Sequence, residues 1–129
     1  MRLIGATMSG VRLSMIDAGY ILQPGDLIWT DFDPRMGREQ SGRRPALVIS
    51  LSMFHEASGF AIVCPITSRI RNYGSSVILP EGLPVEGEIL TSHVRSIDKI
   101  ARPVRFAGAA VPEGVLTEVR VKLAVLCGM

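Results

Sequence analysis

The chain has little cysteine and no long apolar run. Its 129 residues include two cysteines, Cys64 and Cys127, and no Cys-x-x-Cys pair. This scarcity argues against a disulfide framework and against a structural zinc site. No apolar stretch approaches the roughly 18 residues that a membrane-spanning helix needs, and the first 20 residues do not have the pattern of a signal peptide. We therefore expect no metal or other cofactor, no membrane contact and a cytoplasmic protein.

Lysine is scarce among the cations. Two of the 14 are lysines and the rest are arginines, with a formal net charge of +2. The planar fork of arginine fits phosphates and base edges, which favours a nucleic-acid partner, although the codon preference of a GC-rich genome explains the bias equally well. The cations gather in residues 35–44, 69–71 and 95–105. If these three basic stretches meet in space, they form an anion-binding face.

What is present suits one small β-rich domain. The hydrophobic fraction is 47% and the mean hydropathy is +0.32, which is enough for a packed core in a chain of this length. Short apolar runs bounded by glycine, proline and polar residues predict strands at 27–33, 46–49, 60–66, 76–79, 88–94 and 104–109. Between them we expect a mobile loop at 34–42, a helical turn at 53–56 and a turn at 97–102.

The two ends of the chain have different patterns. Residues 1–20 show weak periodicity, and we expect a poorly ordered extension before a domain at 21–129. Pro112 and Glu113 suit the start of a helix. The following apolar residues recur at helical spacing, which predicts a C-terminal helix that faces the core: Val115, Val119, Leu123 and Leu126. The predicted fold class is mainly β with a C-terminal helix, built as a small, strongly bent antiparallel barrel.

Two kinds of side chain are expected to be structural. Cys64 and Cys127 lie in apolar surroundings, which predicts buried thiols. Trp29 and Phe32 could stack on bases, but their strand spacing favours core or dimer contacts.

Three sequence blocks resemble the MazF/PemK toxin family. The first reads Pro-Gly-Asp-Leu-Ile-Trp at 24–29, Asp-Phe-Asp-Pro at 31–34 and Gly-Arg-Glu-Gln-Ser-Gly-Arg-Arg-Pro-Ala-Leu-Val at 37–48. The second reads Cys-Pro-Ile-Thr-Ser at 64–68. The third reads Gly-Glu-Ile-Leu at 87–90, followed by Val-Arg-Ser-Ile-Asp at 94–98 and Ala-Arg at 101–102. The blocks occur in order from about residue 23 to the C-terminus.

This resemblance implies an SH3-like barrel that forms a homodimer. It implies a toxin of a type II toxin–antitoxin system, a metal-independent endoribonuclease that cuts single-stranded mRNA at short sequences. The products would carry 2′,3′-cyclic phosphate and 5′-hydroxyl ends. A cognate antitoxin would neutralise it, and we expect a disordered acidic tail of that antitoxin to lie in the RNA groove.

Two other functions fit parts of the pattern. One is a gyrase-poisoning toxin similar to CcdB. Those toxins use a C-terminal Trp-Gly-Ile motif, whereas this chain ends Leu-Cys-Gly-Met. The other is a non-catalytic RNA-binding relative.

Cleavage by the ribose 2′-hydroxyl needs a base, a group that stabilises charge on the phosphate, and a proton for the leaving 5′-oxygen. By resemblance, Arg44 and Thr67 are catalytic. We expect Arg44 to stabilise charge, because its pKa above about 12 suits a general acid poorly. Thr67 either donates to a phosphate oxygen or caps a turn. Glu39 is either a base or a loop carboxylate paired with a neighbouring arginine.

His93 is the remaining candidate catalytic residue. The Asp-Gln pair common in the family is Ser92-His93 here. Histidine is the side chain with an ordinary pKa near neutrality, so His93 is either a base or a structural hydrogen-bonding residue. The polar residues around these positions are expected to bind RNA: Arg38, Gln40, Arg43, Ser68, Arg69 and Arg95.

Overall fold

A computed structural model describes residues 20–32 and 43–129. Residues 1–19 of the expected extension, and the loop residues Arg38, Glu39 and Gln40, lie outside the described residues. The elements are, in chain order, β1 (Asp26–Asp31), β2 (Arg43–Val48), α2 (Ser52–Ser58), β3 (Phe60–Thr67), β4 (Val77–Ile78), β5 (Glu88–Ile89), the 3₁₀ turn η3 (Thr91–His93), β6 (Arg95–Asp98), β7 (Val104–Ala110) and α3 (Glu113–Leu126).

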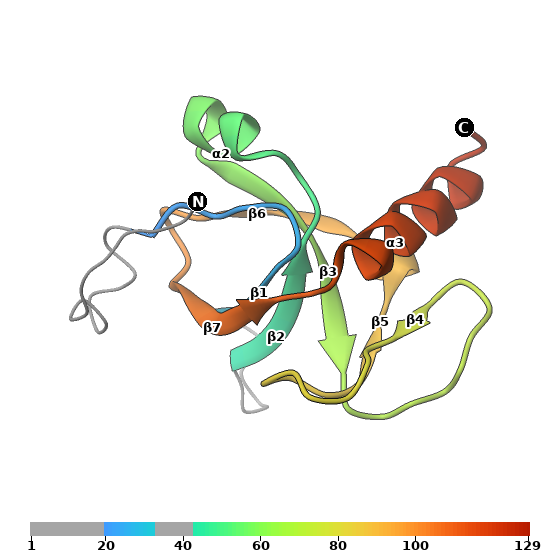
Figure 1. The fold of residues 1–129 in the computed structure, drawn as a ribbon. Coiled ribbons are helices and arrows are strands. Elements are labelled where there is room, and N and C mark those ends of the chain that lie inside the picture. The colour runs from blue at the N-terminus through green and yellow to red at the C-terminus, as the bar shows by residue number, and fades with distance from the viewer. Residues whose placement is uncertain (1–19, 33–42) are drawn as a thin grey trace.

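The strands form one bent antiparallel sheet (Figure 1). Its order is β4-β5-β3-β2-β1-β7, and β6 pairs with β3. The edge of β3 that faces away from β2 pairs with two strands. β6 pairs with residues 60–63, and β5 pairs with residues 66–67. The pairings found in the described part of the chain do not close the sheet. The predicted fold class, mainly β and strongly bent with a C-terminal helix, is confirmed.

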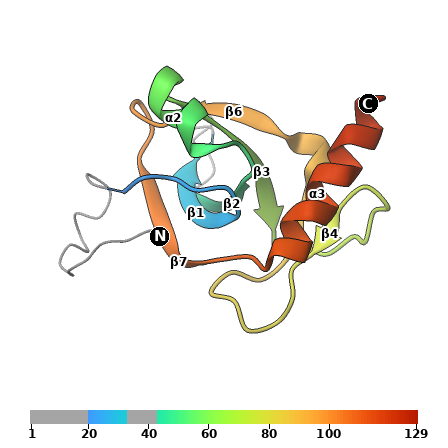
Figure 2. The ribbon, with the colours of Figure 1, turned by 45° about the horizontal axis from the view of Figure 1, so that its top comes forward.

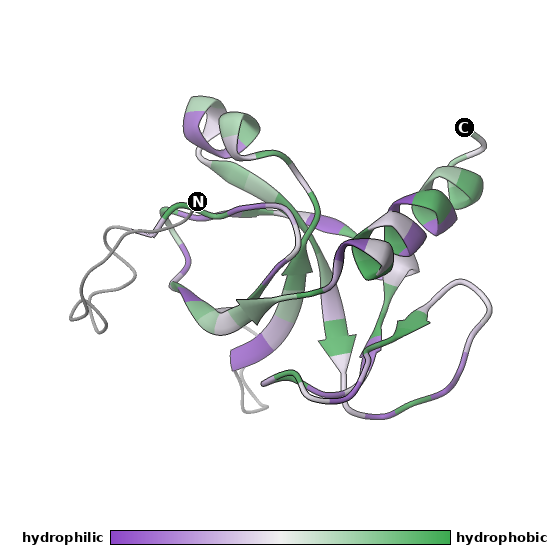
Figure 3. Ribbon diagram, viewed as in Figure 1, coloured by the Kyte–Doolittle hydropathy of each residue, from purple (hydrophilic) through white to green (hydrophobic). Residues whose placement is uncertain are grey.

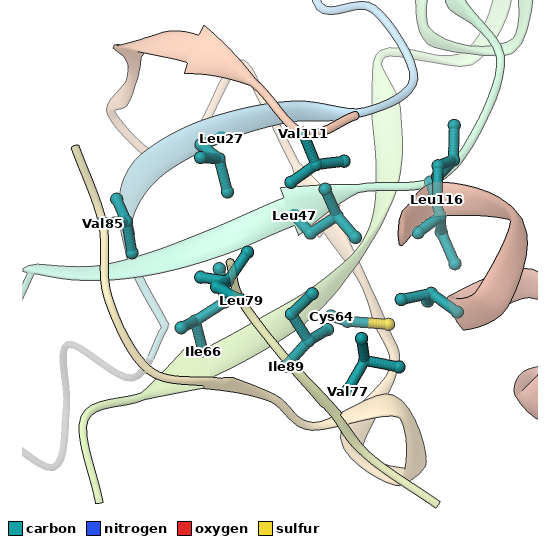
Figure 4. Packing of buried hydrophobic residues seen from close by; sticks show 12 residues of the cluster. Leu27, Leu47, Cys64, Ile66, Val77, Leu79, Val85, Ile89, Val111 and Leu116 are labelled. Atoms are coloured by element: carbon teal, nitrogen blue, oxygen red, sulfur yellow. The ribbon is translucent and has the colours of Figure 1, made fainter. Parts of the chain in front are cut away.

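Alternation of side chains along the strands gives the sheet two buried faces. The concave face, around which β1, β2, β3, β6 and β7 curl (Figure 2), holds one apolar cluster: Leu22, Ile28, Phe32, Ala46, Val48, Ala61, Val63, Ile97 and Val104. The helix face holds the second cluster, shown in Figure 4, in which Leu116 and Val119 of α3 pack over Leu47, Cys64 and Ile89. Trp29 packs against this second cluster, so the prediction that Trp29 and Phe32 serve the core is confirmed.

Helix α3 departs from the sequence prediction at its end. Val119 is buried as expected, and Leu116, which lies outside the predicted repeat, is buried as well. Val115 and Leu123 are half-buried, whereas Leu126 is 49% exposed and Cys127 is exposed. The last turns of α3 extend past the sheet (Figure 1), so the final apolar residues of the helix have no sheet surface to pack against. The prediction that Cys127 is buried is wrong, whereas Cys64 is buried as predicted.

The segment after β5 is the other correction. The predicted strand 88–94 stops at Ile89, and Thr91–His93 form a 3₁₀ turn. The chain then returns to β3 as β6 in a shifted register, where the sequence predicts a turn beginning at residue 97. The apolar pattern of residues 88–94 cannot reveal this break, because the break depends on the residues of β3 with which β5 and β6 pair.

Two polar contacts, one of them buried, join the first described residues to the domain. The Tyr20 hydroxyl donates to Asp26 Oδ2 at 2.5 Å, and the Tyr20 ring stacks on Phe106. His55 Nδ1 lies 3.1 Å from the carbonyl oxygen of Leu22. These contacts place Tyr20 with the folded domain.

Candidate functional site

The register of β2 and β3 brings the two leading candidates together. The β2–β3 ladder ends at the pair Ala46–Pro65, and Arg44 and Thr67 each lie two residues beyond that pair, at the same edge of the sheet. Side chains two residues apart share a face, so Arg44 lies on the concave face with Ala46, and Thr67 lies there with Val63. The ends of β2 and β3 thus bring a guanidinium and a hydroxyl to one edge of one face.

Arg44 is available to bind an anion. It is exposed, and within residues 20–32 and 43–129 its side chain makes no hydrogen bond or ion pair. Pro45 restricts its backbone to the extended conformation that β2 requires. Figure 3 shows the first residues of β2 as hydrophilic, in contrast with the apolar remainder of the strand. An exposed guanidinium with unused donors suits bidentate contact with a phosphate.

Thr67 already takes part in a turn. Its Oγ1 accepts a hydrogen bond from the backbone N–H of Arg69 at 3.1 Å. This contact uses the oxygen as an acceptor, so the hydroxyl proton remains available to donate to a ligand oxygen. Turn capping and phosphate contact, the two roles expected for Thr67, are therefore compatible.

Arginines from the third block hold the end of β1. The Arg95 guanidinium lies over the Phe32 ring, 5.1 Å from its centroid. Arg102 Nη1 donates to the carbonyl oxygens of Asp31 and Phe32, each at 2.7 Å. Sequence reasoning missed the anchoring role of Arg102, and no local signal could have revealed it, because both acceptors are main-chain atoms about 70 residues away.

The three basic stretches meet only in part. Arg44 and Arg95 lie on the concave face. Arg43 pairs with Asp31, and Arg105 pairs with Trp29, which places both on the helix face. The expectation of one face formed by all three stretches is therefore too simple: the sheet divides the cations between its two sides.

The loop after β3 carries further candidates. Ser68 and Arg69 are exposed directly after Thr67, and Arg71 is exposed beyond them. Gly87 approaches this point closely, because a Cβ built on it would lie 2.1 Å from the Thr67 carbonyl oxygen. The structure therefore groups Arg44, Thr67, Ser68 and Arg69 at neighbouring strand ends.

His93 lies in a different place. It is exposed at the end of η3, in the chain between the two strands that pair with β3. Leu90, which precedes η3, donates its N–H to the Pro65 carbonyl oxygen, so η3 lies along β3 before Thr67. Arg95, two residues after His93, pairs with Val63. Val63 lies four positions before Thr67 in β3, which corresponds to roughly 13 Å of strand.

Other features of the described residues bear on the chemistry. No three of their His, Cys, Asp and Glu side chains come together as a metal site. None of their helices combines the length and apolar character needed to cross a membrane. Burial raises the pKa of the Cys64 thiol to about 12, so Cys64 is no nucleophile.

Comparison with known proteins gives a consistent result. Residues 23–127 match the model of the PemK-like, MazF-like toxins of type II toxin–antitoxin systems. The endoribonuclease toxin MazF of Escherichia coli strain K12 is 38% identical over 109 residues, covering 84% of this chain and 96% of that protein. Endoribonuclease EndoA of Bacillus subtilis is 33% identical over 88 residues, covering 61% of this chain and 72% of that protein.

Solved structures agree with this result. The crystal structure of MazF from Deinococcus radiodurans has a TM-score of 0.77 and 44% identity, covering 85% of this chain and 99% of that one. A MazE–MazF crystal structure from the same organism matches with a TM-score of 0.78 and 42% identity, at 85% and 99% coverage.

Proposed function

The chain belongs to the PemK-like, MazF-like toxin family of type II toxin–antitoxin systems, and we propose that it is an endoribonuclease that cleaves single-stranded RNA. The observation that supports the proposal is the β2–β3 pairing, because Thr67 and the exposed Arg44 both lie just beyond its last pair, at one edge of the concave face. A guanidinium and a hydroxyl on neighbouring strand ends can both contact one phosphate.

Each proposed residue has a distinct task. The ribose 2′-hydroxyl loses its proton to a base and attacks the adjacent phosphorus. The 5′-oxygen leaves and takes up a proton from the protonated base or from water, and a 2′,3′-cyclic phosphate remains. Arg44 stabilises the extra negative charge on the phosphate oxygens, and the Thr67 hydroxyl donates a hydrogen bond to one of them. Glu39 or His93 removes the 2′-hydroxyl proton. Of the two, Glu39 is our first candidate, because the exposed His93 lies on η3 and not at the strand ends.

The flanking residues would hold the RNA. Ser68 and Arg69 follow Thr67 directly, and Arg95 is exposed on the concave face. Arg43 would contact the RNA from the helix face of the sheet. Arg38 and Gln40 complete the proposed RNA-binding set.

We also propose the expected partners. MazE–MazF complexes are known in Deinococcus radiodurans, and we propose a cognate antitoxin for this chain whose acidic tail occupies the RNA groove. The exposed apolar side chains of Ile78, Val121 and Val125 suit a homodimer contact. RNA and antitoxin would meet the toxin in the cytoplasm.

The test is cleavage of an end-labelled single-stranded RNA by purified protein in excess EDTA. The proposal expects cuts at a short sequence, with 2′,3′-cyclic phosphate and 5′-hydroxyl ends. Activity that disappears in EDTA and returns with magnesium or zinc would contradict the metal-free mechanism. Intact RNA together with gyrase-dependent DNA cleavage would favour the CcdB-like alternative, and RNA binding without cleavage would favour a non-catalytic relative.

A further inference from the structure

A buried carboxylate lies beside the proposed catalytic threonine without belonging to the catalytic set. Glu88 is fully buried at the start of β5, where it pairs with Thr67 of β3. Its Oε1 accepts the backbone N–H of Arg71 at 2.8 Å. Its Oε2 accepts the backbone N–H of Tyr73 at 3.1 Å and the hydroxyl of Ser76 at 2.5 Å. Both carboxylate oxygens thus hold the loop that leaves β3.

The acceptors follow the loop in order. Thr67 Oγ1 takes the N–H of Arg69, and the two oxygens of Glu88 take those of Arg71 and Tyr73. The backbone N–H groups of Arg69, Arg71 and Tyr73 are therefore all bound by the Thr67–Glu88 pair. The side chains of these three residues are exposed, and Arg71 Nη1 lies 3.5 Å from the Tyr73 hydroxyl. Part of the loop's main chain is thus bound, and its cationic and aromatic side chains are exposed to a ligand.

The charge of Glu88 is well supported where it lies. The Ser76 hydroxyl, and then the backbone N–H groups of the loop, lower the pKa of Glu88 below its ordinary value despite burial, so the carboxylate is ionised at neutral pH. An ionised group in the interior is costly unless its lone pairs are satisfied. A carboxylate whose oxygens accept mainly loop N–H groups can hold that loop in one conformation.

We propose that Glu88 is a positioning residue for RNA cleavage. It holds residues 69–73 so that Arg69, Arg71 and Tyr73 form an accessory contact for the RNA strand next to the Arg44–Thr67 site. The guanidinium groups take phosphates, and the Tyr73 ring takes a base face. This inference rests on the proposed RNA cleavage, because it assigns a further contact of that same site.

The first test compares Glu88→Gln with Glu86→Gln in single-turnover cleavage of single-stranded RNA. Glu86 is exposed two residues away, and its substitution removes the same charge. Charge alone predicts that loss of either acid leaves RNA binding equal or tighter. Positioning predicts the opposite sign for Glu88→Gln: the apparent KM for RNA rises and kcat/KM falls by about tenfold or more, while Glu86→Gln cleaves like the parent.

The second test asks whether Glu88 acts through the loop. In Arg71→Ala protein, Glu88→Gln should cost clearly less than it does in the parent, because the group that it positions is already gone. Both Arg71→Ala and Glu88→Gln should also flatten the dependence of log kcat/KM on log salt concentration, by about 0.7 for each lost phosphate contact. A purely structural defect would leave that slope unchanged and would add to the Arg71→Ala loss.

Folding is checked by thermal unfolding of each variant. If Glu88→Gln does not fold, Ser76→Ala replaces it, since that change removes one hydrogen bond to the carboxylate and should lower kcat/KM about two- to fivefold, in the same direction. A parent that does not cleave RNA overturns the proposed function. An active parent with unchanged kcat/KM in folded Glu88→Gln, or in Ser76→Ala where that variant replaces it, overturns the positioning role.

Discussion

The two histidines of this chain lie in opposite surroundings. His55 is buried in α2, with Nδ1 at the Leu22 carbonyl and Nε2 2.6 Å from the Ser50 hydroxyl. His93 is exposed on η3. The first therefore contributes to stability, and the second is the one that could meet a ligand.

Substitution of His93 tests whether it is the catalytic base. We expect His93→Gln to keep the parent rate and the parent pH–rate profile on the best RNA substrate, because η3 lies away from the strand ends that hold Arg44 and Thr67. Single-turnover rates from pH 5 to 8 measure this. A flattened profile with a rate lower by about 10²–10⁴-fold would instead assign the base role to His93.

The surroundings of His55 predict a pH-dependent stability. Burial, the largest effect, lowers the pKa of His55 below its ordinary value of 6.5. The unfolded chain then binds a proton at a higher pH than the folded chain does. The stability from neutral His55 is complete above about pH 6.5 and is lost as the pH falls towards the lowered folded-state pKa.

Urea unfolding at pH 7.5 and pH 5 measures this loss. The difference between the two pH values should shrink in His55→Gln, even though that variant is less stable at both. It should persist in His93→Gln, the exposed control. An undiminished pH dependence in His55→Gln would show that other groups cause it.

At the scale of elements, the turn between β4 and β5 depends on Gly87. Its φ is +134°, and an added Cβ would lie 2.1 Å from the Thr67 carbonyl oxygen. Glycine alone allows β5 to approach β3 this closely and places Glu88 beside Thr67. Gly87 is therefore required by the path of the backbone, and Glu88, the next residue, anchors the loop that follows β3.

Gly87→Ala should destabilise the protein by about 3 kcal/mol or more, since backbone strain and a main-chain clash combine. Gly82 is the matched control: its φ is +94°, but nothing lies within 4 Å of an added Cβ. Gly82→Ala should cost about 1 kcal/mol. Chemical denaturation of both variants gives the comparison, and equal losses would mean that the contact with Thr67 does not matter.

The elements also divide into those that sequence predicts and those that it does not. The runs at β1, β2, β3 and β7, and the 3.6-residue pattern of α3, depend on local sequence and are found close to their predicted positions. Helix α2 spans Ser52–Ser58, where the sequence predicts a single helical turn at 53–56. The break at η3 and the strand β6 depend on pairing with β3, which is distant in sequence. Local patterns carry no information on such pairing.

At the scale of the whole molecule, the sheet sorts the arginines by face. Arg43 and Arg44 are adjacent in sequence, but alternation places Arg43 with Asp31 on the helix face and Arg44 on the concave face. The blocks of the sequence supply the candidate residues. Their grouping at strand ends, and the anchoring by Glu88 and Arg102, come only from the long-range register.

The pair Arg43 and Arg44 provides the most direct test of the account. Single-turnover cleavage of single-stranded RNA in EDTA is measured for the parent, Arg44→Ala, Arg44→Lys and Arg43→Ala. Arg44→Ala should lose about 10²–10³-fold in rate with unchanged thermal stability. Arg44→Lys should recover little, because an ammonium cannot reproduce the guanidinium fork. Arg43→Ala should stay within about tenfold of the parent, as expected for a binding contact. Parent-like cleavage by Arg44→Ala, or an equal loss in Arg43→Ala, would contradict the account.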